Sequence, residues 1–127
     1  MARGFTLLEL LVVLFIVALL ASLVAPAVTS GVQKWKEAAL REDLRVMRKS
    51  IDDFYSDTGA WPQTIEVLVE KHYLRAIPPD PISGSQTTWT FEMEESQDSG
   101  GDKTRGIRDV HSGAEGQGRD GTSYSEW

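Results

Sequence analysis

The feature that most constrains this chain is an apolar run from residue 5 to residue 28. Within the run the only polar side chains are Thr6, Glu9 and Ser22. A helix over its 24 residues would be about 36 Å long, enough to cross a hydrocarbon core of about 30 Å. We therefore expect a membrane-spanning helix, with Arg3 holding the N-terminus in the cytoplasm.

Glu9 is an ionisable carboxylate near the start of this apolar helix. A charged side chain at membrane depth is costly unless it has a partner, so by default it indicates a function. The alternative is a carboxylate that merely lies at the membrane interface, stabilised by the positive end of the helix dipole.

A secretory signal peptide is another explanation of a basic leader followed by an apolar run. Residues 21–23 or 25–27 would then supply the small residues of a cleavage site. The run is longer than a usual signal core, and helical sequence continues beyond it. These two observations favour a membrane-spanning helix.

Pro26 lies inside the same helix. Proline lacks an N–H, so the carbonyl of Ser22 loses its usual partner, and we expect a kink or a loosened turn there. The Ser22 hydroxyl is expected to satisfy part of that deficit. The alternative is a boundary proline at which the membrane span ends.

Beyond residue 30 the sequence predicts a continuation of the helix, to about Tyr55. Apolar residues recur at spacings of three and four and predict one buried face: Leu40, Leu44, Met47, Ile51 and Phe54. Gly59 is expected to end the helix in a left-handed conformation. We thus expect one helix from about Thr6 to Tyr55, whose second half packs on a small domain.

The remaining sequence predicts an α+β fold for the domain formed by residues 30–127. Thr64 is a candidate cap for a short helix that buries Ile65, Leu68 and Val69. Residues 77–81 are proline-rich and should be extended, and the alternation of Trp89, Phe91 and Met93 with polar residues predicts a strand. Residues 95–105 are expected to be a loose connection, residues 106–111 the pairing strand of a small antiparallel sheet, and residues 112–127 a glycine-rich loop.

Composition excludes several classes of function. The chain has no cysteine, so disulfides and thiolate metal sites are excluded, and its formal net charge of −6 argues against a nucleic-acid surface. His72 and His111 are isolated from any nucleophile in a recognisable spacing, and we expect His111 to be a surface residue at a strand end. We predict that the chain is not an enzyme.

Residues 4–9, Gly-Phe-Thr-Leu-Leu-Glu, resemble the processing motif of the type IV pilin-like family. The resemblance implies that prepilin peptidase removes a leader of residues 1–4 by cutting between Gly4 and Phe5, and that Phe5 is then N-methylated. It implies that Glu9 engages the new terminal amine of a neighbouring subunit during assembly. Pro26 matches a proline that family members carry where the helix of the filament is partly unwound.

Within that family the chain resembles the major pseudopilins of type II secretion, through Asp80-Pro81, Trp89 and residues 109–127. The resemblance implies a periplasmic fibre that drives export of folded proteins through the outer membrane. Residues 5–29 would anchor each subunit in inner-membrane lipid before assembly, with the head, residues 30–127, in the periplasm. Expected partners are copies of the chain, minor pseudopilins and the inner-membrane secretion platform. Alternatives are a type IV pilin for adhesion, motility or DNA uptake, and a membrane-anchored binding module that does not assemble.

The resemblance also implies a calcium site in the glycine-rich tail. The matching positions are the backbone carbonyl of Ser112 and the side chains of Glu115 and Asp120. Calcium takes six to eight oxygen ligands, for which acids among glycines are suitable. Glu115 stands where the family has an aspartate, and Asp120 is alone where adjacent acids are frequent. The alternative is an acidic, solvated loop held by Tyr124 and Trp127.

Overall fold

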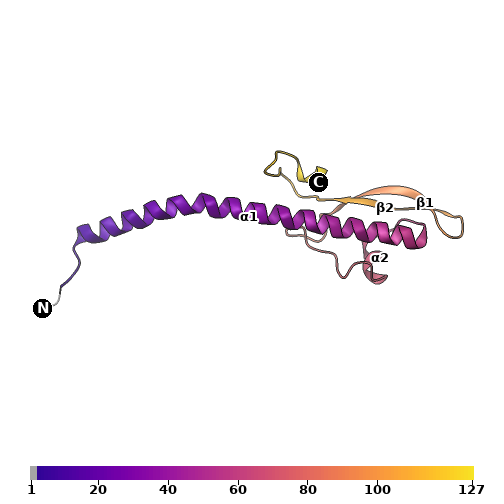
Figure 1. The fold of residues 1–127 in the computed structure, drawn as a ribbon, viewed down its shortest axis with the longest axis horizontal. Helices are drawn as coiled ribbons and strands as arrows, with labels where there is room; N and C mark the ends of the chain where they lie inside the picture. Colours follow the sequence, from indigo (N-terminus) through magenta and orange to yellow (C-terminus); the bar gives the residue numbers. More distant parts are fainter. Residues whose placement is uncertain (1–2) are drawn as a thin grey trace. The chain divides into compact units, whose positions relative to one another are not determined.

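The computed structural model describes residues 3–127, and the chain divides into two compact units, residues 1–35 and 36–127. Helix α1, Leu7–Thr58, belongs to both units (Figure 1). It ends as predicted at Gly59, which has a φ of 76° and donates its N–H to the Tyr55 carbonyl at 2.8 Å. The predicted single helix is therefore confirmed, and it is three residues longer at its C-terminal end than expected.

In the first unit, α1 presents its apolar side chains to the outside. Phe15 is 69 % exposed and Leu23 is also 69 % exposed. The helix is long and apolar enough to cross a membrane, judged by length and composition. Burial of these side chains therefore has to come from something other than the described part of this unit.

In the second unit, α1 supplies one side of the hydrophobic core. Leu40, Leu44, Met47 and Ile51 are buried, and Phe54 packs against them, as the sequence predicted. Helix α2, Ile65–Glu70, contributes Leu68, and the β-hairpin contributes other core residues. Figure 1 shows α2 and the hairpin on opposite sides of this part of α1.

The cap predicted for α2 is only partly correct. Thr64 does occupy the N-cap position, with φ −139° and ψ 160°, but its side chain makes no capping hydrogen bond. Ile65 and Leu68 are buried and Val69 packs against the core, as expected. The helix is therefore held by its apolar face rather than by its cap.

Strands β1, Thr90–Gln97, and β2, Lys103–His111, form an antiparallel hairpin. The expectation that residues 95–105 are a loose connection was wrong, because most of them extend the ladder. The turn closes where Asp98 N–H donates to the Asp102 carbonyl at 2.9 Å. The polar residues between 95 and 105 show no alternation of apolar side chains. Strand pairing does not need it, because the backbone supplies the hydrogen bonds.

A β-bulge interrupts the hairpin at Arg108. Glu92 pairs with Asp109 whereas Met93 pairs with Ile107, so Arg108 is the extra residue. Met93, predicted to face inward, is 40 % exposed. Simple alternation along β1 therefore fails at the bulge.

The tail after β2 is a structured loop, as predicted. It contains a bridge between Gln117 and Ser123 and a short 3-10 helix, η1, Tyr124–Glu126. Tyr124 is buried, and its hydroxyl donates to Glu37 Oε1 at 3.2 Å. The same oxygen accepts the Arg119 N–H at 2.9 Å. One buried carboxylate on α1 thus holds the loop at two points.

Candidate functional site

Thr6 and Glu9 exchange two hydrogen bonds at the start of α1. The Thr6 N–H donates to Glu9 Oε2 at 2.9 Å, and the Glu9 N–H donates to Thr6 Oγ1 at 3.2 Å. This reciprocal pair is a capping box, with threonine at the N-cap and glutamate three residues later. The cap at Glu9 was not predicted, although the spacing Thr-x-x-Glu is the sequence signal for it.

Gly4 and Phe5, the predicted processing residues, precede α1 in a segment without regular secondary structure. The Phe5 side chain is 84 % exposed, and nothing lies within 4 Å of the position that a Cβ on Gly4 would take. The bond between them is therefore on accessible chain, where proteolysis is favoured. Of the predicted leader, residues 1 and 2 lie outside the described residues.

Pro26 lies in a part of α1 that stays helical on both sides of it. The Ser22 hydroxyl donates to the Leu19 carbonyl at 2.7 Å, rather than relieving the deficit near Pro26 as predicted. Thr29 Oγ1 lies 3.0 Å from the Pro26 carbonyl and 3.3 Å from that of Ala25. No unwound turn is present at this position of the described chain, and the role of Pro26 in assembly stays a prediction.

The three predicted calcium positions differ in environment. Ser112 is fully buried, and its hydroxyl donates to the buried carboxylate of Asp80, whereas Glu115 is exposed. Asp120 Oδ1 accepts from Thr122 N–H at 3.0 Å and from Thr122 Oγ1 at 2.6 Å. The Arg41 guanidinium lies 3.7 Å from Asp120 Oδ2.

A calcium ion at Asp120 would have to displace the contacts that Asp120 makes with Thr122 and Arg41. Hydrogen bonds from Thr122, with a smaller contribution from Arg41, lower the pKa of the Asp120 carboxyl, so it is ionised at neutral pH. A charged carboxylate oxygen is a suitable calcium ligand. Both oxygens of Asp120 already have partners, so calcium would have to compete with Thr122 and Arg41.

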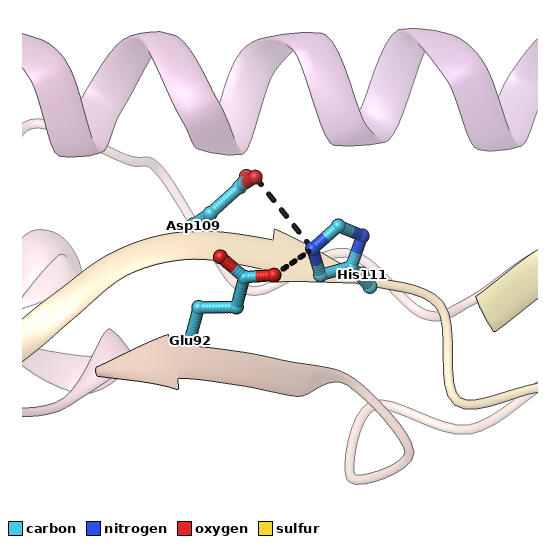
Figure 2. Close-up of side chains that lie close together, drawn as sticks. All are labelled: Glu92, Asp109 and His111. Atoms are coloured by element: carbon cyan, nitrogen blue, oxygen red, sulfur yellow. Dashed lines mark hydrogen bonds and ion pairs between the residues drawn. The ribbon is translucent and has the colours of Figure 1, made fainter. Parts of the chain in front are cut away.

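A group that the sequence analysis did not predict lies on the hairpin (Figure 2). His111 Nε2 is 3.1 Å from Glu92 Oε1 and 3.6 Å from Asp109 Oδ2. The expectation that His111 is an isolated surface residue was wrong. Only 20 % of its side chain is exposed, and both ring nitrogens have partners. The Asp-x-His spacing places Asp109 and His111 on one face of β2. That Glu92 joins them could be predicted only from the pairing register of β1 and β2.

Arg48 connects this group to α1. Its Nε donates to Asp109 Oδ1 at 2.8 Å, and its Nη2 donates to the backbone oxygens of Val110 at 2.9 Å and Trp127 at 2.8 Å. The same Trp127 oxygen is 2.7 Å from His111 Nδ1. The side chain of Arg48 thus joins helix, strand and tail beside the group on the hairpin.

Comparison with known proteins identifies a family motif at the N-terminus and similarity to relatives over a longer span of the chain. Residues 1–25 match the family described as the prokaryotic N-terminal methylation motif. The matched stretch includes Gly4, Phe5 and Glu9. No solved structure matches the chain.

Similar proteins over a longer span are named type II secretion system core protein G. The Klebsiella michiganensis protein is 31 % identical over 98 residues, covering 65 % of this chain and 69 % of the relative. The Klebsiella pneumoniae protein is 34 % identical over 95 residues, covering 62 % and 68 %. The Pseudomonas aeruginosa protein is 33 % identical over 94 residues, covering 61 % of this chain and 66 % of the relative. The chain thus spans about two thirds of the length of these relatives.

Proposed function

The chain belongs to the family of the type II secretion system core protein G, and from that membership we propose that it is a structural subunit of a periplasmic pseudopilus. As a member of this family it is a building block and not an enzyme. The observation that carries the proposal is the methylation motif, which covers the start of a helix whose apolar side chains are exposed. Such a surface has to be covered by lipid or by other copies of the helix.

In this proposal, prepilin peptidase cuts between Gly4 and Phe5, and the new amine on Phe5 is methylated. Cleavage leaves the Thr6 amide in the chain, so the capping box of Thr6 and Glu9 survives it. The capping hydrogen bond uses Glu9 Oε2, so Oε1 can accept a hydrogen bond from an amine of a neighbouring subunit. Glu9 thus caps its own helix and sets the register of the next subunit.

The proposed location is the inner membrane, with the N-terminus cytoplasmic and the head, residues 30–127, in the periplasm. Arg3 precedes the apolar segment and favours this orientation. Assembly would move the segment from lipid into a filament core, where Ala18, Ala21 and Ala25 permit close approach of helices. Minor pseudopilins and the inner-membrane platform are the further partners proposed.

The test of the proposal is the assembly of processed subunits. Mass spectrometry of the mature protein should give an N-methylated terminus at Phe5. Glu9→Gln keeps the shape and an acceptor oxygen but removes the charge, so the variant should be processed normally and should assemble poorly. Glu66→Gln, at an exposed position of α2 outside every proposed site, is the matched control and should assemble like the wild type.

Two other functions are distinguished by the same experiment. A membrane-anchored module that does not assemble predicts no filament of either protein and no effect of Glu9→Gln. A type IV pilin for adhesion, motility or DNA uptake predicts the same processing but a surface fibre rather than a periplasmic one. Equal polymerisation of the wild type and Glu9→Gln would contradict the role proposed for the carboxylate.

We further propose calcium as a ligand of the tail loop, through the Ser112 carbonyl, Glu115 and Asp120. The support is the resemblance of the tail and the ionised state of Asp120. Millimolar calcium should then raise the melting temperature of the full chain in detergent, because a ligand that binds only the folded state stabilises it. The shift should be lost in Asp120→Asn, and an equal shift in that variant would remove Asp120 from the site.

A further inference from the structure

We propose that Glu92, Asp109 and His111 form a binding site for a divalent transition-metal ion, with Zn²⁺ as the best-fitting ion. The proposed ligand atoms are His111 Nε2 and one carboxylate oxygen from each acid. They all lie within 4.8 Å of one another. The site is separate from the predicted calcium positions, and it does not depend on the function proposed above.

The tautomer of His111 is the first step of the argument. Its Nδ1 lies 2.7 Å from the backbone oxygen of Trp127. An oxygen of this kind only accepts hydrogen bonds, so Nδ1 carries the proton. In a neutral ring the lone pair of Nε2 then points toward the carboxylates of Glu92 and Asp109 (Figure 2). Three electron-rich atoms that face one another favour a positive charge between them, which is supplied either by a metal ion or by a proton on Nε2.

The spacing of these atoms suits a tetrahedral metal ion. Zinc lies about 2.0–2.1 Å from nitrogen and oxygen ligands, so neighbouring ligand atoms in a tetrahedron are about 3.3 Å apart. The two distances from His111 Nε2, 3.1 Å to Glu92 and 3.6 Å to Asp109, lie on either side of that value. An imidazole nitrogen with two carboxylates favours zinc or a similar metal over calcium.

The strand register explains why the three side chains converge. Glu92 and Asp109 are direct partners across the hairpin, so their side chains share a face. His111 follows Asp109 by two residues and therefore lies on the same face of β2. The Glu92 side chain is 59 % exposed, which gives the ion access and leaves room for water as a fourth ligand.

Two of the three proposed ligands also form hydrogen bonds with neighbouring groups that orient them, as metal ligands usually do. Arg48 Nε donates to Asp109 Oδ1 at 2.8 Å, and Oδ2 of the same carboxylate faces His111. The Trp127 oxygen fixes the ring of His111 in the same way. Both partners come from outside the group, so its orientation does not depend on the ion.

The experiment is a titration of the full chain in detergent with Zn²⁺, measured by competition with a fluorescent chelator. The absorption spectrum of the Co²⁺ complex would report tetrahedral coordination. His111→Asn removes the nitrogen ligand and Glu92→Gln removes a charged oxygen. His72→Asn is the matched control, because His72 is exposed and its φ of 64° is one that asparagine tolerates.

The wild type and His72→Asn should bind one equivalent of Zn²⁺, with at least about 10-fold weaker binding in His111→Asn and Glu92→Gln. Glu92→Gln keeps the test valid if His111→Asn does not fold, since Glu92 is mostly exposed. Equal Zn²⁺ affinity in the wild type and Glu92→Gln would overturn the proposal. Absence of wild-type binding at millimolar Zn²⁺ would also overturn it and would assign the positive charge to a proton on His111.

Discussion

Leucines in the two parts of α1 meet opposite environments. Leu23, in the first unit, is 69 % exposed, whereas Leu40, in the second, is fully buried. Both lie on the same helix, so helix formation alone does not determine where an apolar side chain ends up. The second unit provides its own core, whereas the apolar side chains in the described part of the first unit stay exposed, and we propose that lipid or other subunits cover them. The difference separates residues that stabilise the fold from residues for which we propose a role in assembly.

The largest expected effect is the difference in unfolding free energy between alanine substitutions at these two leucines. Leu40→Ala removes packing inside the head and should lower its free energy of unfolding by about 2–5 kcal/mol. Leu23→Ala leaves that core untouched and should change the unfolding free energy of the head by less than about 0.5 kcal/mol. Denaturant unfolding of the full chain in detergent, followed by the fluorescence of buried Trp89, measures both. A similar loss of unfolding free energy in both variants would contradict the difference drawn between Leu23 and Leu40.

A pair of glycines should give the next largest difference. A Cβ at Gly113 would overlap the carbonyl oxygen of Thr88, which is backbone, whereas nothing lies within 4 Å of a Cβ at Gly31. Gly113→Ala should therefore cost the head about 1–3 kcal/mol. Gly31→Ala should leave the head unchanged and raise helix stability by about 1 kcal/mol, because alanine is the better helix former.

The same unfolding assay, with far-ultraviolet circular dichroism for helix content, compares the two glycine variants. Destabilisation of the head by Gly31→Ala would mean that the first unit contributes to the stability of the second. A neutral Gly113→Ala would mean that the Thr88 segment moves easily away from the tail.

Local sequence patterns predicted the helices and the core well because each signal was contained in a few turns. The spacing from Leu40 to Phe54 fixed the buried face of α1, and Gly59 fixed its end. The extent of the hairpin was missed because residues 95–105 are polar, and a strand exposed on its faces carries no periodic signal.

The candidate sites were predictable only where the chemistry is local. Gly4, Phe5 and Glu9 lie within six consecutive positions, so their motif can be read directly. The group of Glu92, Asp109 and His111 depends on cross-strand register, which the bulge at Arg108 shifts by one residue. No pattern within either strand contains that information.

The smallest expected effect concerns two neighbouring acids on the head part of α1. Burial, with the nearby carboxylate of Asp80, raises the pKa of Asp43, whereas a hydrogen bond from Arg45 lowers the pKa of Glu42. Burial thus dominates the pKa shift of Asp43, whereas the hydrogen bond from Arg45 dominates that of Glu42. Nuclear magnetic resonance titration of the two carboxyl groups should give shifts of opposite sign.

The stability of the head should follow the sign of the Asp43 shift. Because the folded pKa of Asp43 is raised, its contribution is favourable below the unfolded pKa and is lost as pH rises through the folded pKa. Asp43→Asn should therefore be more stable than the wild type at pH 7, by less than about 0.5 kcal/mol since the group is largely solvated. The advantage should disappear below about pH 4. A variant less stable than the wild type at pH 7 would show that the charge of Asp43 has a favourable partner, and that burial does not set its energy.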